Sequence, residues 1–152
     1  MGYLAAGQVI AAVAGIPFQR YLVDAVLRPA GMTTTGFTYG ADGERATGYV
    51  RAPRLADPVL RLMLPRGILG DRHGSYRALR PFLVDGAGYG GLVGDVADAA
   101  RLVRLHLGDG VVDGNRVLSG PTARAMRQIV ASGRAYQHAI GWFRRPTGNQ
   151  EP

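Results

Sequence analysis

The chain has 152 residues, which is enough for one domain with its own hydrophobic core. Its formal net charge is +7, but its 18 basic residues are all arginines spread along the chain. Because the basic stripe and interleaved aromatic side chains of nucleic-acid-binding proteins are missing, we expect no nucleic acid partner. The absence of cysteine excludes disulfides, thiol catalysis and cysteine-ligated metal sites.

Two helices are expected at the beginning of the chain. Residues 3–14 are apolar on nearly every side, which predicts a buried helix. This stretch lacks a positively charged leader, and no apolar run reaches ~18 residues, so we predict neither a signal peptide nor a membrane span. A second helix is expected at 17–28, with Pro17 in its first turn and Pro29 and Gly31 at its end.

The middle of the chain, residues 38–94, is predicted to be rich in loops. Four prolines interrupt it, and only residues 58–64 suggest a short helix. A loop segment of this length is uncommon inside a compact domain. We therefore expect either that it lines a functional cleft or that it holds elements without a clear sequence pattern.

Two helices and a strand are expected in the last third. Asp95 caps a helix over 95–107, and Ser119 opens another over 119–131. The residues expected to face the core are Val96, Ala99, Ala100, Val103 and Leu107 in the first, and Met126, Ile129 and Val130 in the second. Residues 137–144 read as one strand centred on Ile140 and Trp142.

Several short motifs occur together in a fixed order. They are Gly2-Tyr3 followed by an apolar helix, Ile16-Pro17-Phe18, Pro29-Ala30-Gly31-Met32 with Thr35, Ala46-Thr47-Gly48-Tyr49, Gly90-Gly91-Leu92 before a helix, Leu118-Ser119, and Ile140-Gly141-Trp142. In this order the chain resembles the serine β-lactamase-like hydrolases, which include class C β-lactamases, D-alanyl-D-alanine carboxypeptidases and related esterases. The resemblance implies a mostly α, α+β fragment of that fold: its helical region with one or two strands of the sheet. Residues 1–152 are then a partial domain, truncated at both ends.

The catalytic motifs of that family are absent. Its nucleophile lies in Ser-x-x-Lys, and this chain has no lysine. Tyr-x-Asn is missing too, because neither asparagine follows a tyrosine at that spacing. The string His106-Leu107-Gly108 matches the third motif by letters, but it ends the 95–107 helix, where a histidine gains from the helix dipole. We therefore expect no catalytic residue.

Other chemistries are weaker alternatives. A triad of Ser75 with His73 or His138 and an aspartate is compatible with the sequence, since triads are defined by geometry. The three histidines lie far apart, so we expect no metal site and no cofactor.

The glycine run 86–91 supports two interpretations. It contains a literal G-x-G-x-x-G, which would suit a dinucleotide-binding domain. However, Asp95 places a negative charge at the start of the next helix, where a pyrophosphate would bind. The resemblance implies instead that Tyr89, Gly90 and Gly91 line the substrate cleft.

The sequence thus favours a piece of a serine hydrolase that is inactive by itself, with a non-catalytic binding module as a further alternative. The intact protein would act on a small-molecule acyl substrate: a β-lactam, a D-Ala-D-Ala peptide or an ester. Relatives are often found in the bacterial cell envelope, but the sequence does not fix a compartment. Exposed apolar and strand-edge surfaces lead us to expect self-association of the fragment.

Overall fold

A computed structural model describes residues 2–40 and 45–145. Helix α1 (Gly2–Ala14) turns at Gly15 into α2 (Phe18–Leu22), which continues as one π-helical turn over Val23–Leu27. Gly15 has φ +69°, a left-handed backbone that suits glycine at a helix end. Both expected N-terminal helices are therefore present.

The middle of the chain folds into a small lobe, which we call the sheet lobe (residues 48–80). It contains strand β1 (Gly48–Arg51), a short 3₁₀ turn (Arg54–Ala56), helix α3 (Asp57–Met63), and strands β2 (Leu69–His73) and β3 (Tyr76–Leu79). The strands form an antiparallel sheet in the order β1-β3-β2. The expected helix at 58–64 is confirmed, but the description of 38–94 as loop-rich was wrong for this part.

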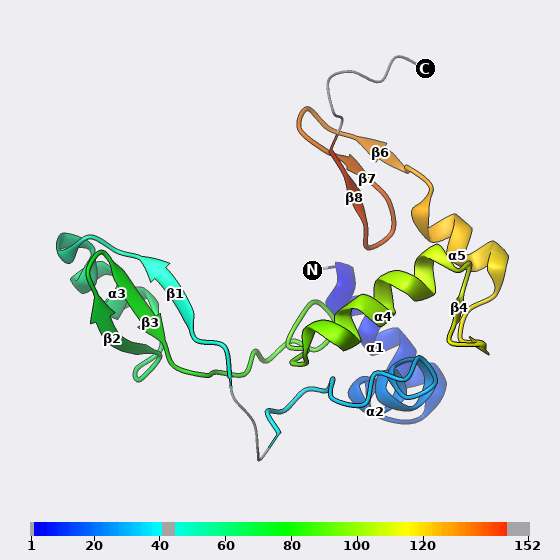
Figure 1. The fold of residues 1–152 in the computed structure, drawn as a ribbon, viewed down its shortest axis with the longest axis horizontal. Helices are drawn as coiled ribbons and strands as arrows, with labels where there is room; N and C mark the ends of the chain where they lie inside the picture. Colours follow the sequence, from blue (N-terminus) through cyan, green and yellow to red (C-terminus); the bar gives the residue numbers. More distant parts are fainter. Residues whose placement is uncertain (1, 41–44, 146–152) are drawn as a thin grey trace.

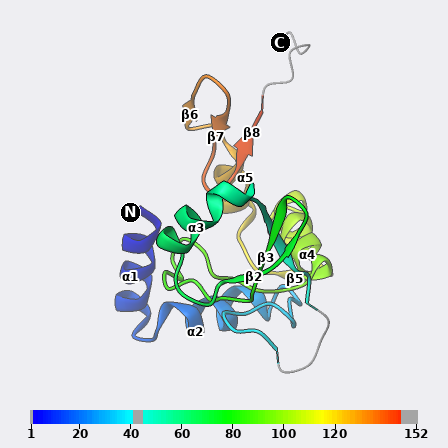
Figure 2. The ribbon, with the colours of Figure 1, turned by 90° about the vertical axis from the view of Figure 1, so that its left-hand side faces the viewer.

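The last third begins with α4 (Val96–Leu107), followed by a hairpin of β4 (Val111–Val112) and β5 (Asn115–Arg116). Helix α5 (Gly120–Arg127) and a three-stranded antiparallel sheet of β6 (Ala131–Ser132), β7 (Gln137–His138) and β8 (Phe143–Arg144) complete the described chain. Figures 1 and 2 show this sheet projecting beyond α5, and Figure 1 shows the sheet lobe set apart from the helices.

Two boundaries in this third differ from expectation. The helix expected over 119–131 ends at Arg127, since Gln128 is already extended, with ψ 136°. The strand expected over 137–144 is a hairpin, because Gly141 adopts φ +75° and reverses the chain between β7 and β8. The caps were predicted correctly: the Asp95 carboxylate accepts from the Asp98 N–H, and the Ser119 hydroxyl accepts from the Thr122 N–H.

The buried core lies between the α2 region and α4. It consists of Leu27, Ala30, Met32, Leu105 and Val112, supported by partly buried Leu22, Val23, Leu102, Val117 and Leu118. The apolar face of α4 expected to point inward was wrong, because Val96 is 86% exposed and Leu107 is 74% exposed. The opposite face, with Leu105 and His106, is the buried one. The inward face expected for a helix over 119–131 was wrong at its end as well, because Val130 lies beyond α5 and is 66% exposed.

No single helix among the described residues is both long and apolar enough to cross a membrane. Helix α1 and residues Phe18–Leu27 reach that length and hydropathy only together, and an 81° bend separates them.

Candidate active-site wall

The glycine run 86–91 lies directly against the first turns of α1. A Cβ atom on Gly88 would lie 2.4 Å from the carbonyl oxygen of Tyr3 and 3.0 Å from Cα of Leu4. One turn further along α1, a Cβ atom on Gly7 would lie 3.3 Å from the Cα of Gly88. The two backbones therefore touch, and only glycine allows this approach.

This packing excludes the dinucleotide interpretation. No strand leads directly into the glycine run, because residues 80–84 belong to no strand. Every strand pairing in the described residues is antiparallel. A dinucleotide site needs the glycine turn between a parallel strand and a helix, with the backbone open to the pyrophosphate. Here the glycines are instead occupied by α1.

The three predicted cleft residues lie at the solvent end of this contact. Tyr89 is 59% exposed, and its ring lies over Gly86, which has φ +148°. Gly90 has open space beside it, whereas Gly91 approaches the carbonyl oxygen of Val84. Tyr3, at the start of α1, is also largely exposed, at 58%. The structure thus brings the glycine run and the beginning of α1 together, which the sequence order alone did not predict.

A cleft of about 300 Å³ runs along the same contact. It is bounded by α1, the start of α2 and residues 85–88, and it carries the polar side chains of Gln8, Gln19 and Asp85 on otherwise apolar walls. The wall offers amide and carboxylate groups able to orient a small polar ligand. It contains no serine, lysine or histidine, so it supplies no nucleophile and no base.

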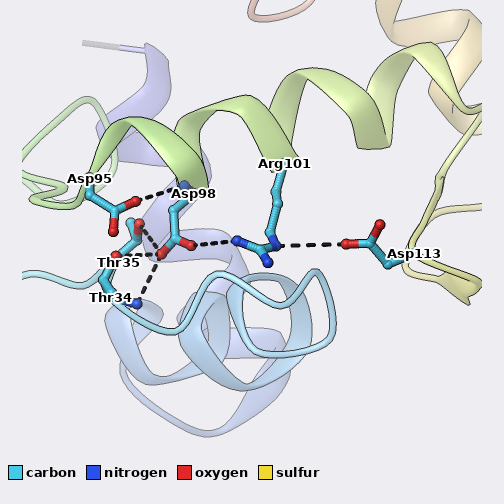
Figure 3. Close-up of polar contacts among 6 residues, drawn as sticks. All are labelled: Thr34, Thr35, Asp95, Asp98, Arg101 and Asp113. Atoms are coloured by element: carbon cyan, nitrogen blue, oxygen red, sulfur yellow. Dashed lines mark hydrogen bonds and ion pairs between the residues drawn. The ribbon is translucent and has the colours of Figure 1, made fainter.

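Asp98 holds the threonine segment that follows the N-terminal helices against the start of α4 (Figure 3). Its side chain is 2% exposed, and one of its carboxylate oxygens accepts from the backbone N–H of Thr34 at 2.9 Å and from the hydroxyls of Thr34 and Thr35 at 2.8 and 2.9 Å. Its other oxygen faces Arg101 at 3.5 Å. Gly36 then exchanges two backbone hydrogen bonds with Val93, just after the glycine run.

The pKa of Asp98 reflects both burial and these donors. Desolvation by burial raises it, but the side-chain and backbone hydrogen bonds from Thr34 and Thr35 outweigh that effect and leave it below the usual aspartate value. The carboxylate is therefore ionised at neutral pH. Asp98 falls inside the helix expected over 95–107, but its buried contacts were not predicted; the threonine string 33–35 was the available signal for a buried acceptor nearby.

His106 lies in the last turn of α4, as expected. It is 6% exposed near the C-terminal end of α4, and its ring packs edge-on against Trp142 with centroids 4.8 Å apart. Burial, together with the positive charge of Arg127, lowers its pKa, so it is neutral at pH 7. It lies on a helix, where the third catalytic motif would require a strand.

The alternative triad is not assembled among the described residues. Ser75 lies in the turn between β2 and β3, Ser119 caps α5, and Ser132 lies in β6. None of these hydroxyls forms a hydrogen bond with His73 or His138 in the described part of the chain. The described residues also contain no group of three metal-ligating side chains.

Comparison with known proteins decides the family. The beta-lactamase family model matches residues 1–151. This chain belongs to the beta-lactamase family. The resemblance to serine β-lactamase-like hydrolases expected from the motifs is therefore confirmed over almost the entire chain.

Two curated relatives come from Mycobacterium tuberculosis: Protein Rv1367c (strain ATCC 25618 / H37Rv) and Uncharacterized protein MT1414 (strain CDC 1551 / Oshkosh). Each is 38% identical over 123 residues, covering 80% of this chain and 27% of the relative. The chain thus spans about a quarter of the length of the curated relatives it matches.

Solved structures show the same fold. An octameric penicillin-binding protein homologue from Pyrococcus abyssi superposes with a TM-score of 0.67 at 18% identity, covering 93% of this chain and 28% of the other. EstCE1, a hydrolase with promiscuous acyltransferase activity, superposes with a TM-score of 0.52 at 23% identity, covering 90% and 37%.

Proposed function

We propose that residues 1–152 are the helical part of a serine hydrolase that works through an acyl-enzyme, and that they form one wall of its substrate cleft. The family match over 1–151 supports this proposal most strongly. In the complete enzyme a serine Oγ attacks an acyl carbonyl, backbone N–H groups hold the oxyanion, and water then releases the acid. The substrate is a β-lactam, a D-Ala-D-Ala peptide or a small ester.

On this proposal, the 152-residue chain by itself does not catalyse acyl transfer or hydrolysis. The chain contains no lysine to activate a serine, and none of its three serines forms a hydrogen bond with a histidine within the described residues. The serine, its lysine and the Tyr-x-Asn group would come from parts of the longer protein. This agrees with the coverage of the relatives, of which the chain matches about a quarter.

Tyr89, Gly90 and Gly91 are the proposed substrate-contacting residues. Tyr89 presents more than half of its side chain to solvent beside the start of α1, and Gly90 has no neighbouring atom within 4 Å of an ideal Cβ. An exposed aromatic ring next to bare backbone suits the flat, apolar side chain of an acyl group. Self-association of the chain is also proposed; the octameric state of the archaeal homologue supports it.

The first experiment uses the purified 152-residue chain. We expect no burst with nitrocefin or a p-nitrophenyl ester and no labelling by fluorescent penicillin, while an active serine β-lactamase measured in parallel gives all three signals. Stoichiometric covalent labelling of Ser75, Ser119 or Ser132 would contradict the proposal.

The second experiment tests the cleft wall in the longer protein that contains these residues. Tyr89→Ala should lower the acylation rate by about tenfold, which corresponds to losing one aromatic contact. Tyr136→Ala is the matched control, because Tyr136 is 48% exposed but lies between β6 and β7. Equal effects of the two substitutions would remove Tyr89 from the cleft.

A further inference from the structure

The outward face of α3 is unusual because its side chains are large and apolar. Leu55, just before the helix, is 93% exposed, and on the helix Leu62 and Met63 are 88% and 74% exposed, with Val59 at 54%. The spacing 55, 59, 62 and 63 puts these residues on one helical face. The inward face carries the charged residue instead: Asp57 forms ion pairs with Arg72 and Arg77 of the underlying sheet.

Most of the net positive charge of the chain lies in the sheet lobe that carries this face. The sheet lobe, residues 48–80, contains seven arginines and two aspartates, a net charge of +5 out of +7 for the chain. Asp57 already pairs with Arg72 and Arg77, whereas Arg51, Arg54, Arg61 and Arg66 have no carboxylate partner among the described residues. A single segment of the chain, folded as the sheet lobe, therefore carries most of the net positive charge.

Arginines also border a recess beside the end of α3. Arg61, Arg66 and Arg77 line a cavity of about 310 Å³ together with Leu64, Pro65 and Leu69. The Nε of Arg77 is buried and faces a carboxylate oxygen of Asp57 at 3.8 Å, so Arg77 is already paired. The guanidinium groups of Arg61 and Arg66 are exposed and are the ones that can bind an oxyanion such as a phosphate.

From these observations we infer that the sheet lobe docks on an anionic lipid surface, with Leu55, Leu62 and Met63 entering the acyl boundary and Arg61 and Arg66 contacting lipid phosphates. An apolar helical face bordered by arginines is the arrangement of interfacial helices, and acidic lipids attract such basic segments. Charge complementarity selects this partner. Nucleic acid is disfavoured because the exposed apolar side chains of the α3 face are aliphatic and offer no ring on which bases could stack; the exposed rings of the lobe, Tyr49 and Tyr76, lie on β1 and β3 instead.

The position of the lobe fits this role. Figure 1 shows the sheet lobe at one end of the molecule, away from α1, α2 and α4. Docking through α3 therefore leaves the proposed cleft wall free. Docking on lipid does not require the acyl chemistry, and the two are tested by separate experiments.

The test is co-sedimentation of the 152-residue chain with vesicles. We expect binding to phosphatidylcholine vesicles that contain phosphatidylglycerol, little binding to pure phosphatidylcholine, and weakening of the binding as salt is raised. Replacing Arg61 or Arg66 by Gln should weaken the partition by about fivefold each. Leu62→Ser with Met63→Ser should weaken it by about tenfold or more, since two exposed apolar side chains lose their burial.

Matched controls lie on other elements. Val96→Ser removes an equally exposed apolar side chain from α4, and Arg20→Gln removes an exposed arginine from α2; both should bind vesicles as the parent does. Far-ultraviolet circular dichroism of each variant checks that the fold is retained.

Three results would overturn the inference. One is no binding to anionic vesicles at low salt. Another is loss of binding that is equal for the α3 variants and for their controls. The third is a different occupant of the face: tighter binding to duplex DNA than to vesicles, or a sedimenting oligomer that dissociates in the Leu62→Ser, Met63→Ser variant.

Discussion

Asp98 on α4 accepts two hydrogen bonds from Thr34, one from its backbone N–H at 2.9 Å and one from its hydroxyl at 2.8 Å, across 64 positions of sequence. The contact fixes the segment after the buried residues Ala30 and Met32 against the first turn of α4. Next to it, Gly36 and Val93 exchange two backbone hydrogen bonds, two positions after the glycine run. One buried carboxylate therefore links the segment after the N-terminal helices to α4.

Removing this carboxylate should destabilise the fold strongly. Asp98→Ala leaves three donors without their acceptor, and we expect the free energy of unfolding to fall by about 2–4 kcal/mol. Asp95→Ala removes only a helix cap and should cost about 1 kcal/mol. Urea unfolding followed by circular dichroism measures both. Asp71→Ala, at an exposed position in β2, is the control and should stay within about 0.5 kcal/mol of the parent. A cost for Asp98→Ala no larger than that for Asp95→Ala would show that the threonine contacts contribute little.

The glycine run offers a second, paired prediction. Gly88→Ala would place a Cβ 2.4 Å from the backbone oxygen of Tyr3, so α1 and the run must separate. We expect a loss of more than about 2 kcal/mol of stability from this overpacking. Gly90→Ala meets no atom within 4 Å and should be neutral or slightly stabilising, because the unfolded chain loses freedom. Thermal unfolding of the two variants distinguishes them, and equal melting temperatures would contradict the backbone contact.

The dependence of stability on pH follows from three groups with lowered pKa values. Burial and Arg127 lower the pKa of His106 in the folded state, so the unfolded state binds more protons below about 6.5 and stability falls as the pH drops through that region. Asp98, with its hydrogen bonds from Thr34 and Thr35, and Asp109, with those from Arg127 and Arg124, add a further loss below about pH 4, where their carboxylates are protonated.

His106→Phe separates these contributions. The phenyl ring preserves the edge-on contact with Trp142 but does not titrate, so the decline in stability between about pH 6.5 and 5 should disappear while the decline below pH 4 remains. The measurement is the urea midpoint, followed by Trp142 fluorescence as a function of pH. An unchanged slope between pH 6.5 and 5 in the variant would assign the effect to another group.

The sequence predicted the helices well because their signals are local. Asp95 and Ser119 at helix starts, Pro17 in a first turn and glycine at helix ends each report on a few neighbouring residues. The family motifs predicted the fold for a different reason: they occur in a fixed order along the chain. Substrate-facing roles for Tyr89, Gly90 and Gly91 depended on that resemblance alone.

The strands of the sheet lobe and the β4–β5 hairpin were missed because they carry little alternation of apolar and polar residues. Strand β2, Leu69–His73, contains glycine, aspartate, arginine and histidine in its four last positions, so no period of two is visible. The turns did carry a signal. Gly74-Ser75 joins the paired residues His73 and Tyr76, and Asp113-Gly114, both with positive φ, joins β4 to β5. Two-residue turns of this composition predict hairpins.

The face of α4 was misassigned for a physical reason that leads to the last prediction. Its apolar stripe, Val96, Val103 and Leu107, satisfies the helical period, but the described chain buries the opposite side, where Asp98 meets the threonines and Leu105 enters the core. Helix α1 is similar, with Val9 62% and Val13 85% exposed. Both stripes leave apolar surface in water, which favours association.

We therefore expect the isolated chain to bind ANS at neutral pH and to associate with rising concentration in analytical ultracentrifugation. Trp142, which is only partly buried, should be quenched by acrylamide. Replacing Val96, Val103 and Leu107 together by Ser should shift the population towards monomer without lowering the unfolding midpoint, because these side chains make little contact in the folded chain. Substituting Leu105 by Ser, on the opposite and buried face of the same helix, should instead unfold the protein. A parent chain that stays monomeric, binds no ANS and melts in one cooperative transition would mean that it covers both stripes itself in solution.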